Sequence, residues 1–180
     1  MVFGTIFGIR RSGASPRTGL YAGTLDQIAS AENHGFDDVW LSEHHFIEDG
    51  YLPSILPVAA AIAARAKHIR IASGVLLMPF HNPVRLAEDI AVVDVLSGRR
   101  LELGAGVGFK HEKFEGFNVP FKERGARTDQ ALEIIRQLLG GETVTFKSEF
   151  FDFTNKVTPG PIQKPYPPIW PGGFTPSALR

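Results

Sequence analysis

The sequence predicts an α/β fold in which parallel strands alternate with helices. Apolar runs typical of buried strands recur along the chain, and most are followed by a segment with helical spacing of apolar residues. The candidate functional residues follow the carboxyl ends of the predicted strands, as in open doubly wound sheets and in (β/α)8 barrels. No Gly-x-Gly-x-x-Gly loop follows the first strand, which favours a (β/α)8 TIM barrel.

The elements can be placed from these patterns. Thr24 is predicted to begin the first helix, with Gln27 completing a capping box and Gly35 ending the helix. The predicted strands are 2–9, 36–41, 69–78, 101–105 and 168–170, and the later helices are 54–67, 83–96 and 123–139. A β-hairpin insertion is predicted at 142–157. We expect residues 1–180 to form a single domain, the N-terminal portion of a barrel truncated after strand five, because eight repeats need roughly 250 residues.

Composition excludes several classes of function. The 180 residues include no cysteine, and 19 acidic residues balance 19 Lys plus Arg. Balanced charge gives no basic surface for nucleic acid or for a membrane, and the absence of cysteine excludes disulfides and thiolate metal sites. The apolar N-terminal run is too short for a signal peptide or a membrane span. We therefore expect a cytoplasmic protein.

A carboxylate and two adjacent histidines follow the second predicted strand. They are Glu43, His44 and His45. Successive side chains on a strand point to opposite faces, and no His-x-x-x-His or Cys partner is present, so we predict no metal site. A solvated loop is one interpretation. The other is the polar wall of an active site, where a histidine can move protons near neutral pH.

Glycines interrupt two strand-like runs. Gly74 lies within a β-branched run and indicates either a bulge or contact with a ligand. Gly104, Gly106 and Gly108 accompany the fourth strand and indicate either a flexible loop or close approach of the backbone to a flat ligand.

The end of the fifth strand has a different pattern. Gly173 and Thr175 follow it, immediately before a predicted helix start. Backbone amides at such a position suit a phosphate group.

Four stretches together resemble the bacterial-luciferase-like flavin-dependent oxidoreductases. They read "WLSEHHF…DGYLPS", "IASGVLLMPFHNPVRLAEDIAVVDVLSGRRLELGAGVGF", "FKERGARTDQALEIIRQLL" and "PPIWPGG". The resemblance extends from the first strand to the last residue and covers the N-terminal half to two-thirds of a usual member. It implies a (β/α)8 barrel of the luciferase-like type that binds a reduced flavin on its C-terminal face.

The resemblance also implies roles for particular residues. His44 matches the catalytic histidine of the family, and Glu43 and His45 match its neighbours in the same loop. Gly74 and Val75 match a non-prolyl cis peptide behind the flavin ring.

Further positions match the cofactor contacts of the family. Gly106 matches the loop that faces the flavin ring, and Arg124 or Arg127 matches an arginine that binds the flavin phosphate. Gly173 and Thr175 would lie at the same phosphate.

The function implied is that of a monooxygenase which uses reduced FMN and O2 on a small organic substrate. Many FMN-using members carry an arginine where this chain has Val107, which leaves a deazaflavin coenzyme and hydride transfer as the alternative. A flavin-binding or truncated remnant without turnover is a third interpretation. The expected partners are the substrate, O2, a flavin reductase that supplies the reduced flavin, and a second copy of the chain in a homodimer formed by the helices at 57–66 and after Pro83.

Overall fold

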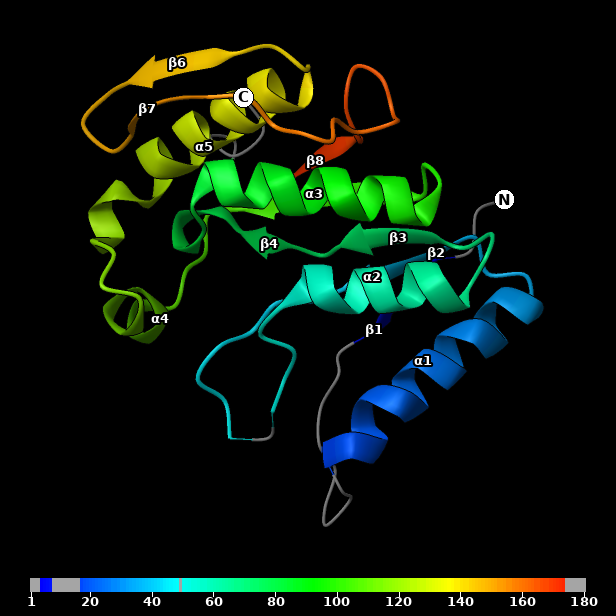
Figure 1. The fold of residues 1–180 in the computed structure, drawn as a ribbon. Helices are drawn as coiled ribbons and strands as arrows, with labels where there is room; N and C mark the ends of the chain where they lie inside the picture. Colours follow the sequence, from blue (N-terminus) through cyan, green and yellow to red (C-terminus); the bar gives the residue numbers. More distant parts are fainter. Residues whose placement is uncertain (1–3, 8–16, 49, 174–180) are drawn as a thin grey trace.

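A computed structural model describes residues 4–7, 17–48 and 50–173. Its strands form a parallel sheet in the order in which they occur along the chain (Figure 1). The strands are β1 (Gly4–Phe7), β2 (Asp38–Leu41), β3 (Arg70–Ser73) with β4 (Leu76–Leu77), β5 (Leu101–Gly106) and β8 (Ile169–Gly172). The predicted α/β class with parallel neighbouring strands is therefore confirmed.

Helices cover one face of this sheet and pack against one another in sequence (Figure 1). They are α1 (Arg17–Asn33), α2 (Ile55–Arg65), α3 (Pro83–Ser97) and α5 (Arg124–Leu139). The short helix α4 (His111–Gly116) lies beyond the ends of the strands (Figure 1). Two 3-10 turns, η1 (Met78–Phe80) and η2 (Phe121–Glu123), precede α3 and α5. In the range predicted to hold a hairpin, β6 (Val144–Lys147) and β7 (Asp152–Asn155) pair antiparallel.

The two faces of the sheet differ because side chains alternate along each strand. Val39, Leu41 and Ile71 are fully buried in the core beneath the helices. On the other face, the Trp170 indole Nε1 donates to Glu102 Oε2 at 2.8 Å. Trp170 is 52% exposed, so this face carries polar and aromatic groups in place of a covering helix layer.

Two sequence-based boundaries were wrong. Helix α1 already includes Arg17, and the Thr24 hydroxyl donates to the Leu20 carbonyl one turn earlier (2.9 Å). Thr24 therefore lies inside the helix and does not cap its start. The third predicted strand is divided into β3 and β4, which flank a cis peptide between Gly74 and Val75.

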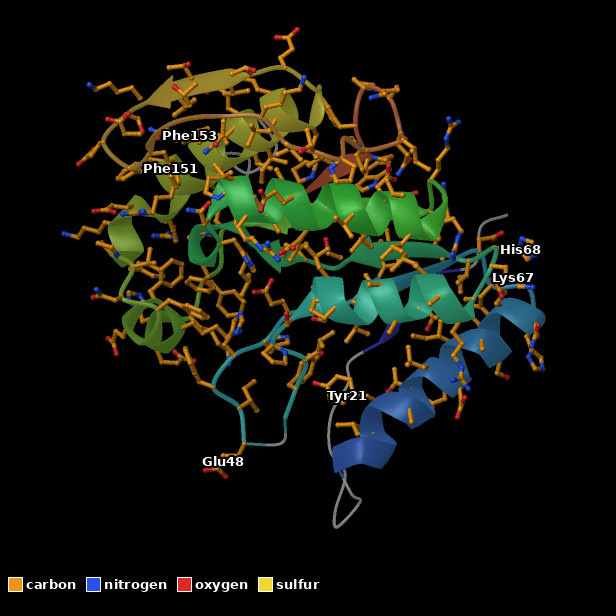
Figure 2. All side chains as sticks on the ribbon, viewed as in Figure 1. Tyr21, Glu48, Lys67, His68, Phe151 and Phe153 are labelled. Carbon is orange, nitrogen blue, oxygen red and sulfur yellow. The ribbon has the colours of Figure 1, made fainter. Side chains whose placement is uncertain are left out.

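Two acidic side chains fix the connections at the amino-terminal edge of the sheet. The Glu32 carboxylate on α1 accepts from the backbone amides of Lys67 (3.0 Å) and Ile69 (2.8 Å), in the turn where Figure 2 labels Lys67 and His68. The fully buried Asp94 on α3 accepts from the amides of Ile162 (2.7 Å) and Gln163 (2.9 Å). The segment that leads into β8 is thereby attached to α3.

The Ser73 side chain joins β3 to β5 where the strand is interrupted. Its hydroxyl donates to the Gly104 carbonyl and accepts from the Gly104 amide, both at 2.8 Å. A Cβ atom at Gly104 would overlap the Ser73 carbonyl oxygen. Position 104 consequently has no room for a side chain.

Replacing Gly104 with Ala is expected to lower the free energy of unfolding by about 3 kcal/mol or more, because backbone atoms must move to admit the methyl group. The matched control is Gly125→Ala, whose Cβ meets nothing within 4 Å and should stabilise α5 by about 0.4–1 kcal/mol. Urea unfolding of the two variants measures both effects. Equal stability of the two variants would contradict the proposed overlap.

Candidate active site

The buried Glu43 side chain connects the segments that follow β2 and β4. Its Oε2 accepts from the Leu77 amide at 2.8 Å. Its Oε1 accepts from His45 Nε2 at 2.6 Å and from His81 Nε2 at 3.2 Å. Glu43 is only 3% exposed, so these contacts replace the water that a carboxylate otherwise needs.

The donors around Glu43 determine its charge. Burial by itself would raise the pKa of this carboxyl, but the hydrogen bonds from His45, His81 and the Leu77 amide outweigh burial and lower the pKa to about 2. Glu43 is therefore an ionised anchor at neutral pH. Its position suits holding the two histidines better than exchanging protons with a substrate.

His44 points to a different set of partners from its neighbour. Its backbone amide donates to the Leu52 carbonyl at 2.9 Å, which fixes the loop. Its ring meets the Tyr51 ring edge-on, with centroids 4.2 Å apart. Its Nδ1 lies 3.2 Å from Nζ of Lys113 on α4. His44 thus connects the loop after β2 to the segment after β5.

His45 is packed among aromatic rings. Its ring lies edge-on to Phe117 at 4.7 Å and to Phe80 at 5.8 Å. We call the group formed by Phe46, Phe80, Phe114, Phe117 and Phe121 the aromatic cluster. It joins the loop after β2, turn η1 and helix α4, so these three segments form one wall of the site.

Phe46 is the most exposed member of the aromatic cluster. It is 63% exposed and has a φ of 58°. Its ring lies so close to Gly116 on α4 that a Cβ there would overlap it. Glycine at position 116 is required by this contact.

The cis peptide that the resemblance implies between Gly74 and Val75 is present. The partly exposed Val75 side chain lies against β5 and β8, where Cβ atoms at Gly106 and Gly172 would each come within 2.6 Å of its methyl groups. Gly106 therefore lies beneath Val75 on the uncovered face of the sheet. Glycine on both strands leaves room for the Val75 methyl groups.

The two candidate phosphate-binding arginines differ in their surroundings. The Arg127 Nε donates to Glu123 Oε2 at 2.7 Å, and its guanidinium lies over the Phe150 ring. Arg124 donates one hydrogen bond, to the Phe121 carbonyl at 2.9 Å, and lies over the Phe121 ring. Arg124 carries no carboxylate partner in the described part of the chain, so it is better suited to an anion.

The remaining predicted residues are less informative. Gly173 directly follows β8, and Thr175 lies outside the described residues.

In the described ranges, no group of three or more His, Cys, Asp or Glu side chains could hold a metal ion. Over the same residues, no helix is both long and apolar enough to cross a membrane.

A pocket lies away from these residues. It has a volume of about 500 Å³ and lies between the start of α3 and the hairpin, near Phe151 and Phe153 (Figure 2). None of the predicted site residues that the structure describes lines it. The predicted residues Glu43 and His44 lie instead at the wall that they form with the aromatic cluster.

Comparison with known proteins identifies the family. The family model described as luciferase-like monooxygenase matches residues 1–180. The chain belongs to this family. Among solved structures, the chain resembles the crystal structure of monooxygenase RslO1 from Streptomyces bottropensis, with 31% sequence identity and a TM-score of 0.88. The match covers 94% of this chain and 52% of that one. The predicted luciferase-like fold class is thereby confirmed.

Among the relatives with functional names, two differ in the cofactor that the name gives. The oxygenase component of the flavin-dependent trigonelline monooxygenase of Acinetobacter baylyi is 29% identical over 88% of this chain and 45% of the relative. The F420-dependent glucose-6-phosphate dehydrogenase of Amycolatopsis mediterranei is 33% identical over 73% of this chain and 41% of the relative. This luciferase-like chain spans about half the length of the curated relatives it matches.

Sequence reasoning missed two residues of this luciferase-like site. His81 follows β4 and Lys113 follows β5, and both reach the loop after β2 across more than 35 positions. The available signal was their place beyond the carboxyl ends of parallel strands, where functional residues gather. That signal does not indicate which of the polar residues there turn inward.

The lowered pKa of Glu43 predicts a dependence of stability on pH. Its folded pKa of about 2 lies below the unfolded value, so its contribution is complete above about pH 4.3 and is lost as the pH falls towards 2. The shift corresponds to a change in the free energy of unfolding on the order of 3 kcal/mol. Glu43→Gln should flatten this part of the profile, measured by urea unfolding between pH 7 and pH 2. The exposed Glu142→Gln control should keep the wild-type slope, and a wild-type slope in Glu43→Gln would contradict the assignment.

Proposed function

We propose that this chain forms the flavin-binding side of a monooxygenase that uses reduced FMN and O2 on a small organic substrate. One observation carries the proposal: Glu43, His44 and Lys113 connect the segments after β2, β4 and β5 at the carboxyl edge of the sheet. In parallel α/β proteins, this edge is where ligands bind. Membership of the luciferase-like family supports the reaction class.

The residues present fit a flavin. Val75 offers an apolar, partly exposed surface. Because Gly106 and Gly172 beneath it have no side chains, the surface there is flat enough to suit a planar ring. Arg124 would bind the phosphate, because a guanidinium can donate to an anion through several N–H groups. Gly173 would contribute its backbone amide, and Thr175 its hydroxyl, at the same phosphate.

Bound reduced flavin would supply the electrons that activate O2. The protein residues would provide position and protons. Glu43 holds His45 in the wall, and His44 would hold or deliver a proton at its ring edge. The aromatic cluster would limit the access of water to this edge.

Hydride transfer with a deazaflavin coenzyme is the second candidate. Val107 stands where many FMN-using members carry an arginine, and a relative of 33% identity is F420-dependent. The two candidates are separated by two assays on the whole protein: reduced FMN is bound anaerobically and O2 is then admitted with substrate, and oxidised deazaflavin is mixed with substrate without O2. Consumption of O2 coupled to substrate oxidation in the first assay supports the monooxygenase, and reduction of the deazaflavin in the second supports the alternative.

The proposed partners follow from the same chemistry. A flavin reductase would supply the reduced flavin, as the name of the related oxygenase component suggests. A homodimer through α2 and α3 is supported by the exposed Val92, Val95 and Leu96 on α3. A monomer mass at micromolar concentration would contradict the dimer. We place the protein in the cytoplasm on its composition.

His44→Ala in the whole protein is expected to reduce turnover by about 10²–10⁴-fold, the usual contribution of an acid–base group. The affinity for reduced flavin should change little, since the phosphate contacts lie elsewhere. Single-turnover kinetics and flavin titration measure both quantities. His34→Ala, at the exposed end of α1, is the matched control and should retain activity. Full turnover in His44→Ala at normal flavin occupancy would remove the histidine from the mechanism.

Arg124→Met is expected to weaken binding of reduced FMN by roughly 2–5 kcal/mol if its charge meets the phosphate. Arg127→Met is the matched control, and we expect a much smaller effect because Arg127 is already paired with Glu123. Anaerobic fluorescence titration measures both dissociation constants. A larger loss in Arg127→Met would reverse the assignment.

A further inference from the structure

We propose that Lys113 is a positioning residue that keeps Nδ1 of His44 unprotonated, so that the neutral ring carries its proton on Nε2. The inference rests on the proposed function for its catalytic meaning, but the state of the ring can be tested without turnover.

The first step is the burial of the lysine. Lys113 is only 5% exposed, and lysine is almost never so buried unless it is paired. Among the described residues, the acceptor within hydrogen-bond distance of its Nζ is His44 Nδ1, at 3.2 Å. The ammonium is therefore placed where this ring nitrogen can replace part of its lost hydration.

The second step is the rigidity of the helix that carries it. Phe114, the next residue on α4, is 1% exposed and lies edge-on to Phe80 at 4.7 Å and to Phe121 at 4.9 Å. The Lys113 carbonyl accepts from the Phe117 amide at 3.0 Å. The packing of Phe114 and the backbone hydrogen bond from Phe117 thus hold the lysine in place, so Nζ is directed at His44.

The third step is the chemistry of the pair. An ammonium has three donors and no acceptor, so a ring nitrogen that bonds to it must accept. A neutral imidazole has one donor and one acceptor, and the proton therefore resides on Nε2. In the opposite arrangement, a protonated Nδ1 would donate to a neutral lysine amine. This would require an imidazole to hold a proton that the lysine has lost, although the ordinary acidities of the two groups differ by about 10⁴-fold in favour of protonated lysine.

The surrounding charges act on this balance in both directions. Burial first, and then the Lys110 charge, lower the pKa of Lys113, while Glu43 and Glu112 raise it. The Tyr51 ring also faces His44, and His45 and His81 face Glu43. The geometry of the Nζ–Nδ1 contact, together with the burial of the lysine, carries the inference.

Nitrogen NMR of the purified protein labelled with ¹⁵N-histidine tests the proposal directly. The His44 signals are assigned by their loss in His44→Gln. We expect an unprotonated Nδ1 and a protonated Nε2 at neutral pH. A protonated Nδ1 in the neutral ring of the wild-type protein would overturn the proposal whatever the activity.

Three variants show whether Lys113 is responsible. In Lys113→Met we expect a mixture of the two ring tautomers and formation of the imidazolium at a pH about one unit higher, because a neighbouring positive charge is lost. Lys113→Arg should restore the wild-type tautomer. The exposed Lys122→Met on η2 makes the same chemical change elsewhere and should leave the His44 signals unchanged. Wild-type His44 signals in Lys113→Met would overturn the assignment to Lys113, and Lys113→Gln serves as the second neutral variant if the Met variant does not fold.

Kinetics then separate this inference from the proposed function. If both hold, Lys113→Met lowers kcat and moves the acidic limb of its pH profile to higher pH, with an unchanged dissociation constant for reduced FMN. If the NMR result is as expected but no flavin-dependent turnover is found, the proposed function fails and the tautomer assignment stands. Unchanged kcat and pH profile in an active Lys113→Met variant would overturn the positioning role.

Discussion

The Glu43 carboxylate is buried and ionised, and the groups hydrogen-bonded to it are all donors. A charge in such a place is stable only while its donors stay in position, because removing one of them leaves part of the charge unsolvated. The donors come from its own loop and from the segment after β4. This side chain, together with the aromatic cluster, therefore fixes the relative position of the two loops.

His44 and His45, which follow Glu43 along the chain, have different partners and different roles in the wall. His45 is held by the carboxylate and packed against aromatic rings, which makes it a part of the framework. His44 turns towards Lys113 and Tyr51. Glu43 contributes an anion and Lys113 a cation, so these two charges offset one another in the wall while the His44 ring is neutral.

The sequence was sufficient for features that local chemistry controls. Strand order followed from the alternation of apolar runs and helices, and glycine at position 74 indicated an irregular strand. It was insufficient where distant groups meet. Thr24 looked like a helix cap, but a hydroxyl inside a helix can equally bond to the carbonyl of the preceding turn. Lys113 was missed because its burial depends on aromatic packing that no local pattern encodes.

The contact of Val75 with Gly106 and Gly172 has a consequence for how the sequence can change. Val75 directly precedes β4, Gly106 lies on β5 and Gly172 lies on β8, but the three residues occupy one small volume. A larger residue at position 106 or 172 is tolerated only if position 75 becomes smaller in the same step, so these sites are epistatic. Substitution of either glycine alone would be disfavoured, although combined replacements could preserve the packing.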